Sequence, residues 1–180
     1  MWTQLENVAT GGSEGGELRE KHLSQLLWAG AGYSHGRERN HLSSHGLSSI
    51  EAYACVLSVE RTFPGVYHYN PKDHSLEQLG NDNPSEHLQQ LIAQPTEIDA
   101  QAAFIVFTGV LNRHRYPHGT RAFRYLLLEA GAAAQATALA ATALGLAVEL
   151  LTDFYDDELI STLKLRSKNE MPLCILAIGR

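Results

Sequence analysis

Cysteine is scarce in this sequence of 180 residues, where only Cys55 and Cys174 occur. Neither has a second cysteine at CxxC spacing, and each lies within an apolar segment. A disulfide framework or a zinc site built on cysteine needs several cysteines at short, regular spacing. We therefore expect two buried, reduced thiols.

Basic residues are also few. The chain has 14 Lys and Arg against 20 Asp and Glu, which gives a formal net charge of -6 at pH 7. Binding to nucleic acid and to anionic membrane surfaces both depend on clustered Lys and Arg, and no such cluster occurs. We expect neither nucleic acid nor a membrane among the partners. With 44% hydrophobic residues, the composition is that of a globular protein with a packed core.

The start of the chain has no positively charged segment followed by an apolar core, so no secretory signal is visible and we expect the cytoplasm. One apolar run, 130–151, is long enough to cross a bilayer at about 1.5 Å per helical residue. Its alanines contribute little to membrane insertion. Four polar residues also interrupt it: Gln135, Thr137, Thr142 and Glu149. We expect a buried helix of a soluble protein.

Common nucleotide and metal motifs are missing. The chain contains no GxGxxG, GxxxxGK[ST] or HExxH pattern. Two histidine pairs have four-residue spacing, His41 with His45 and His114 with His118, as zinc ligands on a helix would. Pro117 and Gly119 argue against a helix around the second pair, and Ser, Gly and Asn surround the first. We expect no metal site.

Residues 1–16 have a flexible, glycine-rich composition, and a single domain is predicted over residues 17–180. Leucines at three- and four-residue spacing predict an amphipathic helix that ends at Gly30 to Gly32. The turn at 70–73 predicts a hairpin. Strands are predicted at 51–59, 66–69, 102–110 and 171–178, and further helices at 85–93, 121–146 and 156–165. The run at 102–110 is continuously apolar, as in a strand covered on both faces. This order indicates an α+β or mixed α/β fold.

Five segments resemble, in order and spacing, the SagB-type nitroreductase-like flavoproteins, the branch that includes the azoline oxidases of ribosomal-peptide maturation. They are 23–29, 65–71, 123–131, 143–146 and 173–180. The resemblance implies a sheet flanked by helices, dimerisation through long central helices, and FMN held at the subunit interface. Small residues on the long helix would then allow two helices to approach closely: Ala132, Ala133, Ala136 and Ala140. The alternative is a helix packed only inside its own subunit.

The stretch 39–51 aligns with a family motif resembling RTxPSSGGLYPLE, which lays backbone amides and a serine against the flavin ring. Ser43, Ser44 and Gly46 match this motif. His45 replaces a glycine, and a side chain there could crowd a backbone that normally lies close to a ligand.

A second family feature is a Gly-Gly step whose backbone amide faces flavin N5. Thr152 and Asp153 align with it. A carboxylate at this place would oppose the negative charge of reduced flavin and make reduction harder.

The family also has an arginine-rich starting strand resembling RRSxR, which clamps the FMN phosphate. Nothing comparable precedes Leu23. The candidates for phosphate binding are therefore Arg180, which matches the family's terminal Gly-Arg, and Arg37 or Arg39.

The azoline oxidases resemble one another in a Lys-Tyr pair before the long helix, proposed to assist proton removal, and this chain has Arg115 and Tyr116 there. Tyr116 can donate or accept a proton. Arginine stays protonated, so Arg115 would act electrostatically rather than as a base. The alternative is a loop arginine beside a packed tyrosine.

The resemblance thus implies an FMN-dependent oxidoreductase that takes hydride from a peptide-derived, small heterocyclic or amine substrate. It would act as a homodimer or within a heteromeric biosynthetic complex. The altered flavin landmarks leave a second hypothesis open, a flavin-free or half-site scaffold subunit that dimerises with or supports a catalytic partner.

Overall fold

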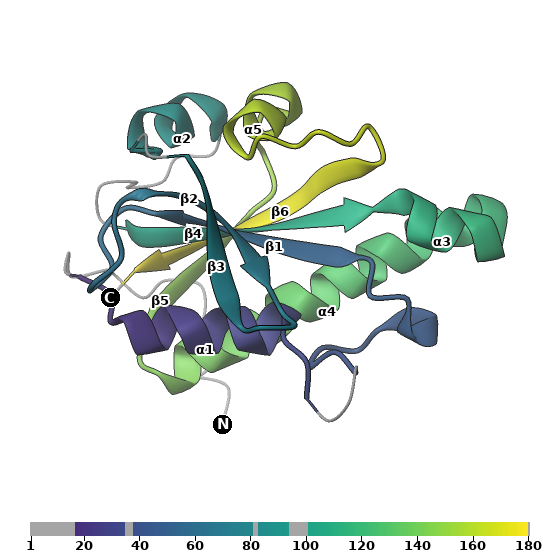
Figure 1. Cartoon of the computed structure of the whole chain (residues 1–180), viewed down its shortest axis with the longest axis horizontal. Helices are drawn as coiled ribbons and strands as arrows, with labels where there is room; N and C mark the ends of the chain where they lie inside the picture. The colour runs from purple at the N-terminus through teal and green to yellow at the C-terminus, as the bar shows by residue number, and fades with distance from the viewer. Residues whose placement is uncertain (1–16, 35–37, 81–82, 94–100, 180) are drawn as a thin grey trace, which may run out of the picture.

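The computed structural model describes residues 17–34, 38–80, 83–93 and 101–179. They form a six-stranded sheet in the order β3-β2-β1-β4-β6-β5, in which every pair is antiparallel. Helices flank this sheet (Figure 1). The strands are β1 (Ile50–Val56), β2 (Gly65–Asn70), β3 (Ser75–Gly80), β4 (Gln101–Val110), β5 (Ala147–Leu151) and β6 (Glu170–Gly179). The helices are α1 (Glu20–Ala31), α2 (Ser85–Leu91), α3 (Leu111–His118), α4 (Ala122–Ala143) and α5 (Asp156–Thr162), with short 3-10 turns at Ser44–Gly46 and Gly119–Arg121. The predicted α+β class is confirmed.

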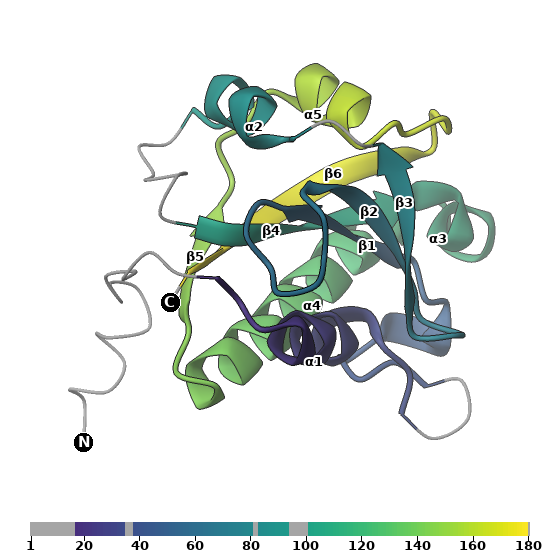
Figure 2. The same ribbon diagram turned by 60° about the vertical axis from the view of Figure 1, so that its left-hand side comes forward.

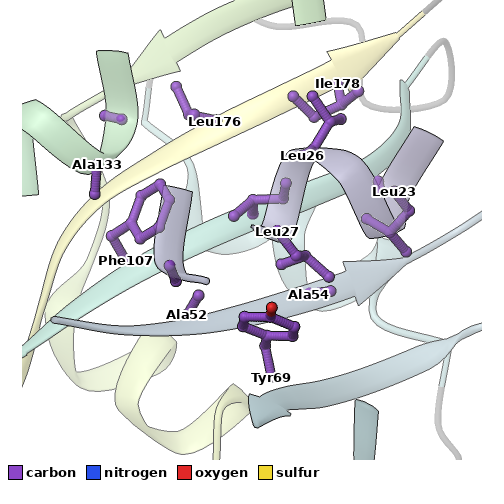
Figure 3. Packing of buried hydrophobic residues seen from close by; sticks show 14 of the residues in the cluster. Leu23, Leu26, Leu27, Ala52, Ala54, Tyr69, Phe107, Ala133, Leu176 and Ile178 are labelled. Carbon is purple, nitrogen blue, oxygen red and sulfur yellow. The ribbon is translucent and has the colours of Figure 1, made fainter. Parts of the chain in front are cut away.

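One face of the sheet is covered by α1 and α4, which lie below it in Figure 2. The leucine spacing of α1 places Leu23, Leu26 and Leu27 on one side of the helix. These side chains pack with Phe107 of β4 and Tyr69 of β2, as Figure 3 shows. The long helix α4 contributes to the same cluster and is therefore part of the core.

The opposite face is covered by α2 and α5. Successive residues of a strand point to opposite faces, so Phe104 and Val106 join this layer while Ile105 and Phe107 join the other. The continuous apolar run of β4 is therefore buried on both sides, as predicted. The same alternation separates the cysteines, because Cys55 lies in the α2 and α5 layer and Cys174 in the α1 and α4 layer. Both thiols are free and buried, and burial raises the pKa of each to about 12.

The predicted hairpin is confirmed as β2 and β3, and its turn is held by the Asn70 side chain. The Lys72 backbone N–H donates to Asn70 Oδ1 at 3.0 Å, and Asn70 Nδ2 donates to Asp73 Oδ2 at 3.1 Å. Strand β3 lies at one edge of the sheet. Its Leu79 carbonyl accepts a hydrogen bond of 2.8 Å from Lys164 Nζ, which follows α5.

Two elements differ from the predictions. Strand β5 was not predicted, because the apolar run that contains it continues the helical pattern up to Leu146; α4 instead ends at Ala143, before Gly145 takes a φ of +70°. Helix α3 was not predicted either, and the expectation that His114 and His118 do not share a helix is wrong. Pro117 lies in the last turn of α3, where few backbone hydrogen bonds remain to be lost.

The stretch Leu111–Ala143 is apolar and long enough to span a membrane by length and composition. Core helices of soluble proteins meet the same criterion. Here Ala133, Thr137 and Ala141 of α4 are fully buried within the chain's own fold, but only 39% of the most apolar window is buried, so the helix packs into the core on one side rather than on most sides.

Candidate functional site

Glu129, the one acidic residue of α4, lies at the centre of the candidate site. It is 1% exposed. Ser43 Oγ donates to Glu129 Oε1 at 2.7 Å, and the Ser49 backbone N–H donates to Oε2 at 3.4 Å. A buried carboxylate is costly unless it is hydrogen-bonded. These bonds therefore hold the loop before β1 against α4.

Two buried histidines lie around this carboxylate. His114 Nε2 is 3.3 Å from Glu129 Oε1, but the pair lacks hydrogen-bond alignment, and His114 Nδ1 has no partner within the described ranges. His41 Nδ1 lies 2.7 Å from the Gly30 carbonyl oxygen, and burial lowers the pKa of His41. Its Nε2 also has no partner in this part of the chain. Because buried polar atoms are rarely left without hydrogen bonds, this polar cluster is unusual within an otherwise apolar core.

Three rings extend the cluster toward solvent. The centroids of His45 and His118 are 4.3 Å apart, and Tyr125 lies 4.9 Å from His118 and 5.1 Å from His45. Desolvation, together with the charges of His45 and His114, lowers the pKa of His118. Among the described residues, no three His, Cys, Asp or Glu side chains are grouped so that they could hold a metal ion.

The 3-10 turn Ser44–Gly46 has a left-handed backbone at two positions. His45 has a φ of +62° and Gly46 a φ of +64°. This conformation is costly for His45 and free for glycine. The His45 ring packs on His118 and Tyr125, and no atom lies within 4 Å of the place that a Cβ would take at Gly46. The backbone at Gly46 is thus open to a ligand.

Arg39 is tied to the fold. Its Nη2 donates to the Ile50 carbonyl at 3.0 Å, Nη1 donates to the Ala31 carbonyl, and its guanidinium lies 4.7 Å from the centroid of the Tyr33 ring. Burial lowers the pKa of Arg39. A guanidinium held by two carbonyls is poorly placed to contact a phosphate. The other two arginines predicted for that role, Arg37 and Arg180, lie outside the described residues.

Tyr116 and Arg115 lie on the solvent side of α3. The Tyr116 side chain is 89% exposed and Arg115 is also exposed, whereas His114 on the same helix is fully buried. The structure therefore does not bring the predicted catalytic pair to Glu129.

Thr152 and Asp153 follow β5, at the other edge of the sheet. Ile50 pairs with Gly109, which pairs with Met171, while Leu151 pairs with Ile175. The start of β1 and the end of β5 are therefore three strands apart across the sheet. They are also four residues apart along β6, and together these offsets correspond to a distance of about 20 Å. Within one chain, the Ser43–Gly46 segment therefore precedes the central strand β1, whereas Thr152 follows the edge strand β5.

The outer side of α4 carries large apolar residues. Phe123, Leu127, Leu128 and Leu139 are each about half exposed or more. An apolar groove of about 260 Å³ runs beside them, between α4 and the β5–β6 pair. Such a patch on a soluble protein marks an interaction surface. Of the small residues predicted to face a second helix, Ala133 is instead buried in the chain's own core, and Ala132, Ala136 and Ala140 are half-buried.

A second polar network ties α3 to β1. Arg113 Nη1 donates to the Ser48 carbonyl at 2.6 Å, and Nη2 lies 2.6 Å from Glu51 Oε1. His68 Nε2 lies 3.4 Å from Glu51 Oε2. Burial alone would raise the pKa of Glu51, but His68 and Arg113 outweigh it and lower that pKa. The hydrogen bond with Glu51 raises the pKa of His68, against the effect of burial.

Sequence reasoning did not find the roles of Glu129, His114 and Tyr125. One signal was available for Glu129, because a single acid within a 22-residue, largely apolar helix is seldom buried without a function or a partner. His114 and Tyr125 gave no comparable signal, since their grouping depends on the unpredicted helix α3.

The sequence pattern of the nitroreductase family matches residues 17–180. The chain belongs to the nitroreductase family. A protein of Methanocaldococcus jannaschii that carries the name nitroreductase MJ1384 is 30% identical over 164 residues, which cover 91% of this chain and 81% of the relative. This nitroreductase-family protein is accordingly an oxidoreductase of that superfamily.

Solved structures share its fold. A nitroreductase from Anabaena variabilis has a TM-score of 0.82 and 27% identity over 100% of this chain, which spans 39% of the Anabaena chain. The E. coli microcin synthetase McbBCD complex with truncated pro-MccB17 bound has a TM-score of 0.80 and 22% identity, covering 98% of this chain and 72% of the other. The Vibrio harveyi NADPH:FMN oxidoreductase complexed with NAD+ has a TM-score of 0.66 and 16% identity, covering 99% and 67%. The last two similarities show the fold.

Proposed function

We propose that this protein is an FMN-dependent oxidoreductase whose flavin lies between two copies of the chain. The supporting observation is that about 20 Å separates the start of β1, which follows Ser43–Gly46, from the end of β5, which precedes Thr152–Asp153. We infer that two copies paired through the uncovered face of α4 bring the two groups to one flavin. The exposed leucines and groove of α4 support that pairing.

The residues present fit the ring end of FMN. Gly46 offers an open backbone, and Ser43 is fixed beside it through Glu129. At the other edge, Thr152 follows one end of the β5–β6 pair and Gly179 closes the other end, with Ala147 as its partner. FMN has a ring at one end and a phosphate at the other, which suits the length of the β5–β6 pair. Arg180, next in sequence to Gly179, is the first candidate for binding the phosphate. Arg37 is the second candidate for the phosphate.

Bound FMN supplies an acceptor for hydride. The chain's own residues would orient the ring through Ser43, Ser44 and Gly46. Tyr116, at the surface of α3, would exchange a proton with solvent or substrate, and the neighbouring charge of Arg115 would stabilise a substrate oxyanion. Asp153 next to the ring would disfavour the reduced, negatively charged flavin.

The proposed substrate is peptide-derived, or a small heterocycle or amine, as in the SagB-type branch. Similarity in fold to a microcin synthetase complex that holds a peptide precursor supports this choice, and also supports a heteromeric complex as an alternative to the homodimer. We place the reaction in the cytoplasm.

Specific observations favour a second candidate, a flavin-free scaffold subunit. Arg39 is bound to backbone carbonyls, and His45 and Asp153 stand where the flavoproteins have glycine. A scaffold would keep the dimerising face of α4 without these flavin contacts.

Absorbance and mass measured on one purified sample test both candidates. A yellow dimer with one or two flavins per two chains supports the oxidoreductase. A colourless dimer that does not respond to added FMN supports the scaffold and refutes the oxidoreductase. A yellow monomer refutes the shared site.

A further inference from the structure

A large cavity lies apart from Glu129, between α1 and the turn of the β2–β3 hairpin. Its volume is about 940 Å³, within the range that holds small-molecule ligands. The residues that decide its chemistry are Ser24, Trp28, Tyr33, Ser34, Lys72 and His74. None of them belongs to the predicted flavin site.

Trp28 gives this cavity a flat apolar wall. Its side chain is 47% exposed. The indole Nε1–H donates to the Tyr33 carbonyl at 3.2 Å, and the Trp28 carbonyl accepts hydrogen bonds from Asn40 Nδ2 at 2.6 Å and from the Gly32 backbone N–H at 2.8 Å. The ring is thus held in place before any ligand arrives, which lowers the entropic cost of stacking on it.

The charge in the cavity is positive. Lys72 lines it, and within the described residues its ammonium group makes no hydrogen bond or ion pair. No Asp or Glu is found among the described lining residues, although acids outnumber bases in the chain by 20 to 14. The Asp73 carboxylate, next along the turn, accepts a hydrogen bond from Asn70 Nδ2 and does not line the cavity, so the Lys72 ammonium favours an anion.

His74 adds a fixed polar group to the lining of the cavity. Its Nε2 lies 2.7 Å from Ser24 Oγ, and its Nδ1 lies 2.8 Å from the Tyr69 hydroxyl. Tyr69 is buried, and burial raises its pKa to about 12, so this hydroxyl stays protonated at neutral pH. His74 has a φ of +50°, a strained conformation that the two hydrogen bonds help to maintain.

We propose that this cavity binds a planar aromatic anion, with its ring on Trp28 and its anionic group at Lys72. A nucleotide phosphate and an aromatic carboxylate both have this chemistry. The cavity shares no lining residue with Ser43–Gly46, Thr152–Asp153 or the outer face of α4, although its Tyr33 ring lies 4.7 Å from the Arg39 guanidinium.

The test uses the full chain with Trp2→Phe, which leaves Trp28 as the sole tryptophan. Its fluorescence is followed while AMP, nicotinate or adenosine is added up to roughly 10 mM, and each titration is repeated by calorimetry. We expect saturable binding of AMP, of nicotinate, or of both, and much weaker binding of uncharged adenosine. AMP alone assigns the phosphate source, and nicotinate alone the carboxylate source.

Matched variants locate the binding. Lys72→Gln should weaken it by about tenfold or more, as expected for loss of a charge-assisted contact. Lys168→Gln, which removes an exposed charge on the turn before β6, should leave it unchanged. No saturable binding of either anion, equal binding of adenosine and AMP, or an unaffected Lys72→Gln variant would each overturn the proposal. Because the titration does not require flavin to bind, it can succeed where the proposed oxidoreductase fails, and the reverse.

Discussion

Ser43 and Glu129 are 86 residues apart in the sequence and are joined by a hydrogen bond of 2.7 Å. Removing the carboxylate with Glu129→Ala would leave the Ser43 hydroxyl and the Ser49 N–H without their acceptor. We expect the free energy of unfolding to fall by about 1–3 kcal/mol, measured by urea denaturation. Glu129→Gln keeps an acceptor and should lose less, and the exposed Glu38→Ala should change little. Equal losses for the Gln and Ala variants would show that the acceptor is unimportant.

Gly30 sets the approach of α1 to α4. A Cβ there would meet Thr137 Oγ1 and the Phe107 ring, so Gly30→Ala should destabilise the fold by about 1–3 kcal/mol despite the better helix propensity of alanine. Thermal or urea unfolding measures the loss. In a Thr137→Ala background the same change should cost less, because one of the two clashes is removed. A stabilising Gly30→Ala would contradict this account.

The His68–Glu51 pair should make stability depend on pH. Because the hydrogen bond with Glu51 raises the pKa of His68 in the folded state, its contribution is complete below the unfolded value of about 6.5 and is lost as pH rises through the raised value. The difference in unfolding free energy between wild type and His68→Gln should therefore shrink across that window. At acidic pH the same free-energy difference should also shrink once pH falls through the lowered pKa of Glu51, because the pair needs the charge of that carboxylate. A difference that stays constant with pH would refute the pair's role.

The outer face of α4 should be the dimer surface. Leu128→Glu places a charge on a side chain that is 61% exposed in one chain and would be desolvated between two. We expect the variant to sediment as a monomer at micromolar concentration and to lose flavin with the dimer. Phe63→Glu, at a more exposed position before β2, should leave both unchanged. A dimeric Leu128→Glu would rule out this face.

Phosphate binding should depend on Arg180. Loss of a charge-assisted contact in Arg180→Ala corresponds to about 1.5–3 kcal/mol, or a weakening of FMN affinity by about tenfold or more. Flavin fluorescence quenching on titration measures it. Arg166→Ala, which removes an exposed arginine after α5, is the matched control. Equal affinity of the two variants would remove Arg180 from the site.

The elements that could be predicted are those whose pattern is local. The leucine spacing of α1 and the apolar run of β4 each follow from one face or both faces being buried. Strand β5 could not be separated from the alanine-rich helix before it, because the boundary is a left-handed Gly145 within a continuous apolar run. Helix α3 was missed because its proline falls in the last turn, where it does little harm.

The candidate site was only partly accessible in the same way. The segment Ser43–Gly46 was found through its resemblance to a family motif. Its attachment to Glu129 depends on how α4 lies under the sheet, and no spacing in the sequence carries that information. Likewise, the engagement of Arg39 by the Ala31 and Ile50 carbonyls shows only when the loop is folded.

The lysine that follows α5 has a consequence for solubility. Strand β3 has a neighbour on one side only, and the carbonyls on its free side could template pairing with a strand of another molecule. Lys164 bonds one of them at Leu79, and Gly80 leaves the space for its side chain. A charged group seated on this edge opposes strand-by-strand polymerisation. Under the proposed pairing, copies of the chain then associate through α4 rather than through the hairpin, and association stops at a dimer.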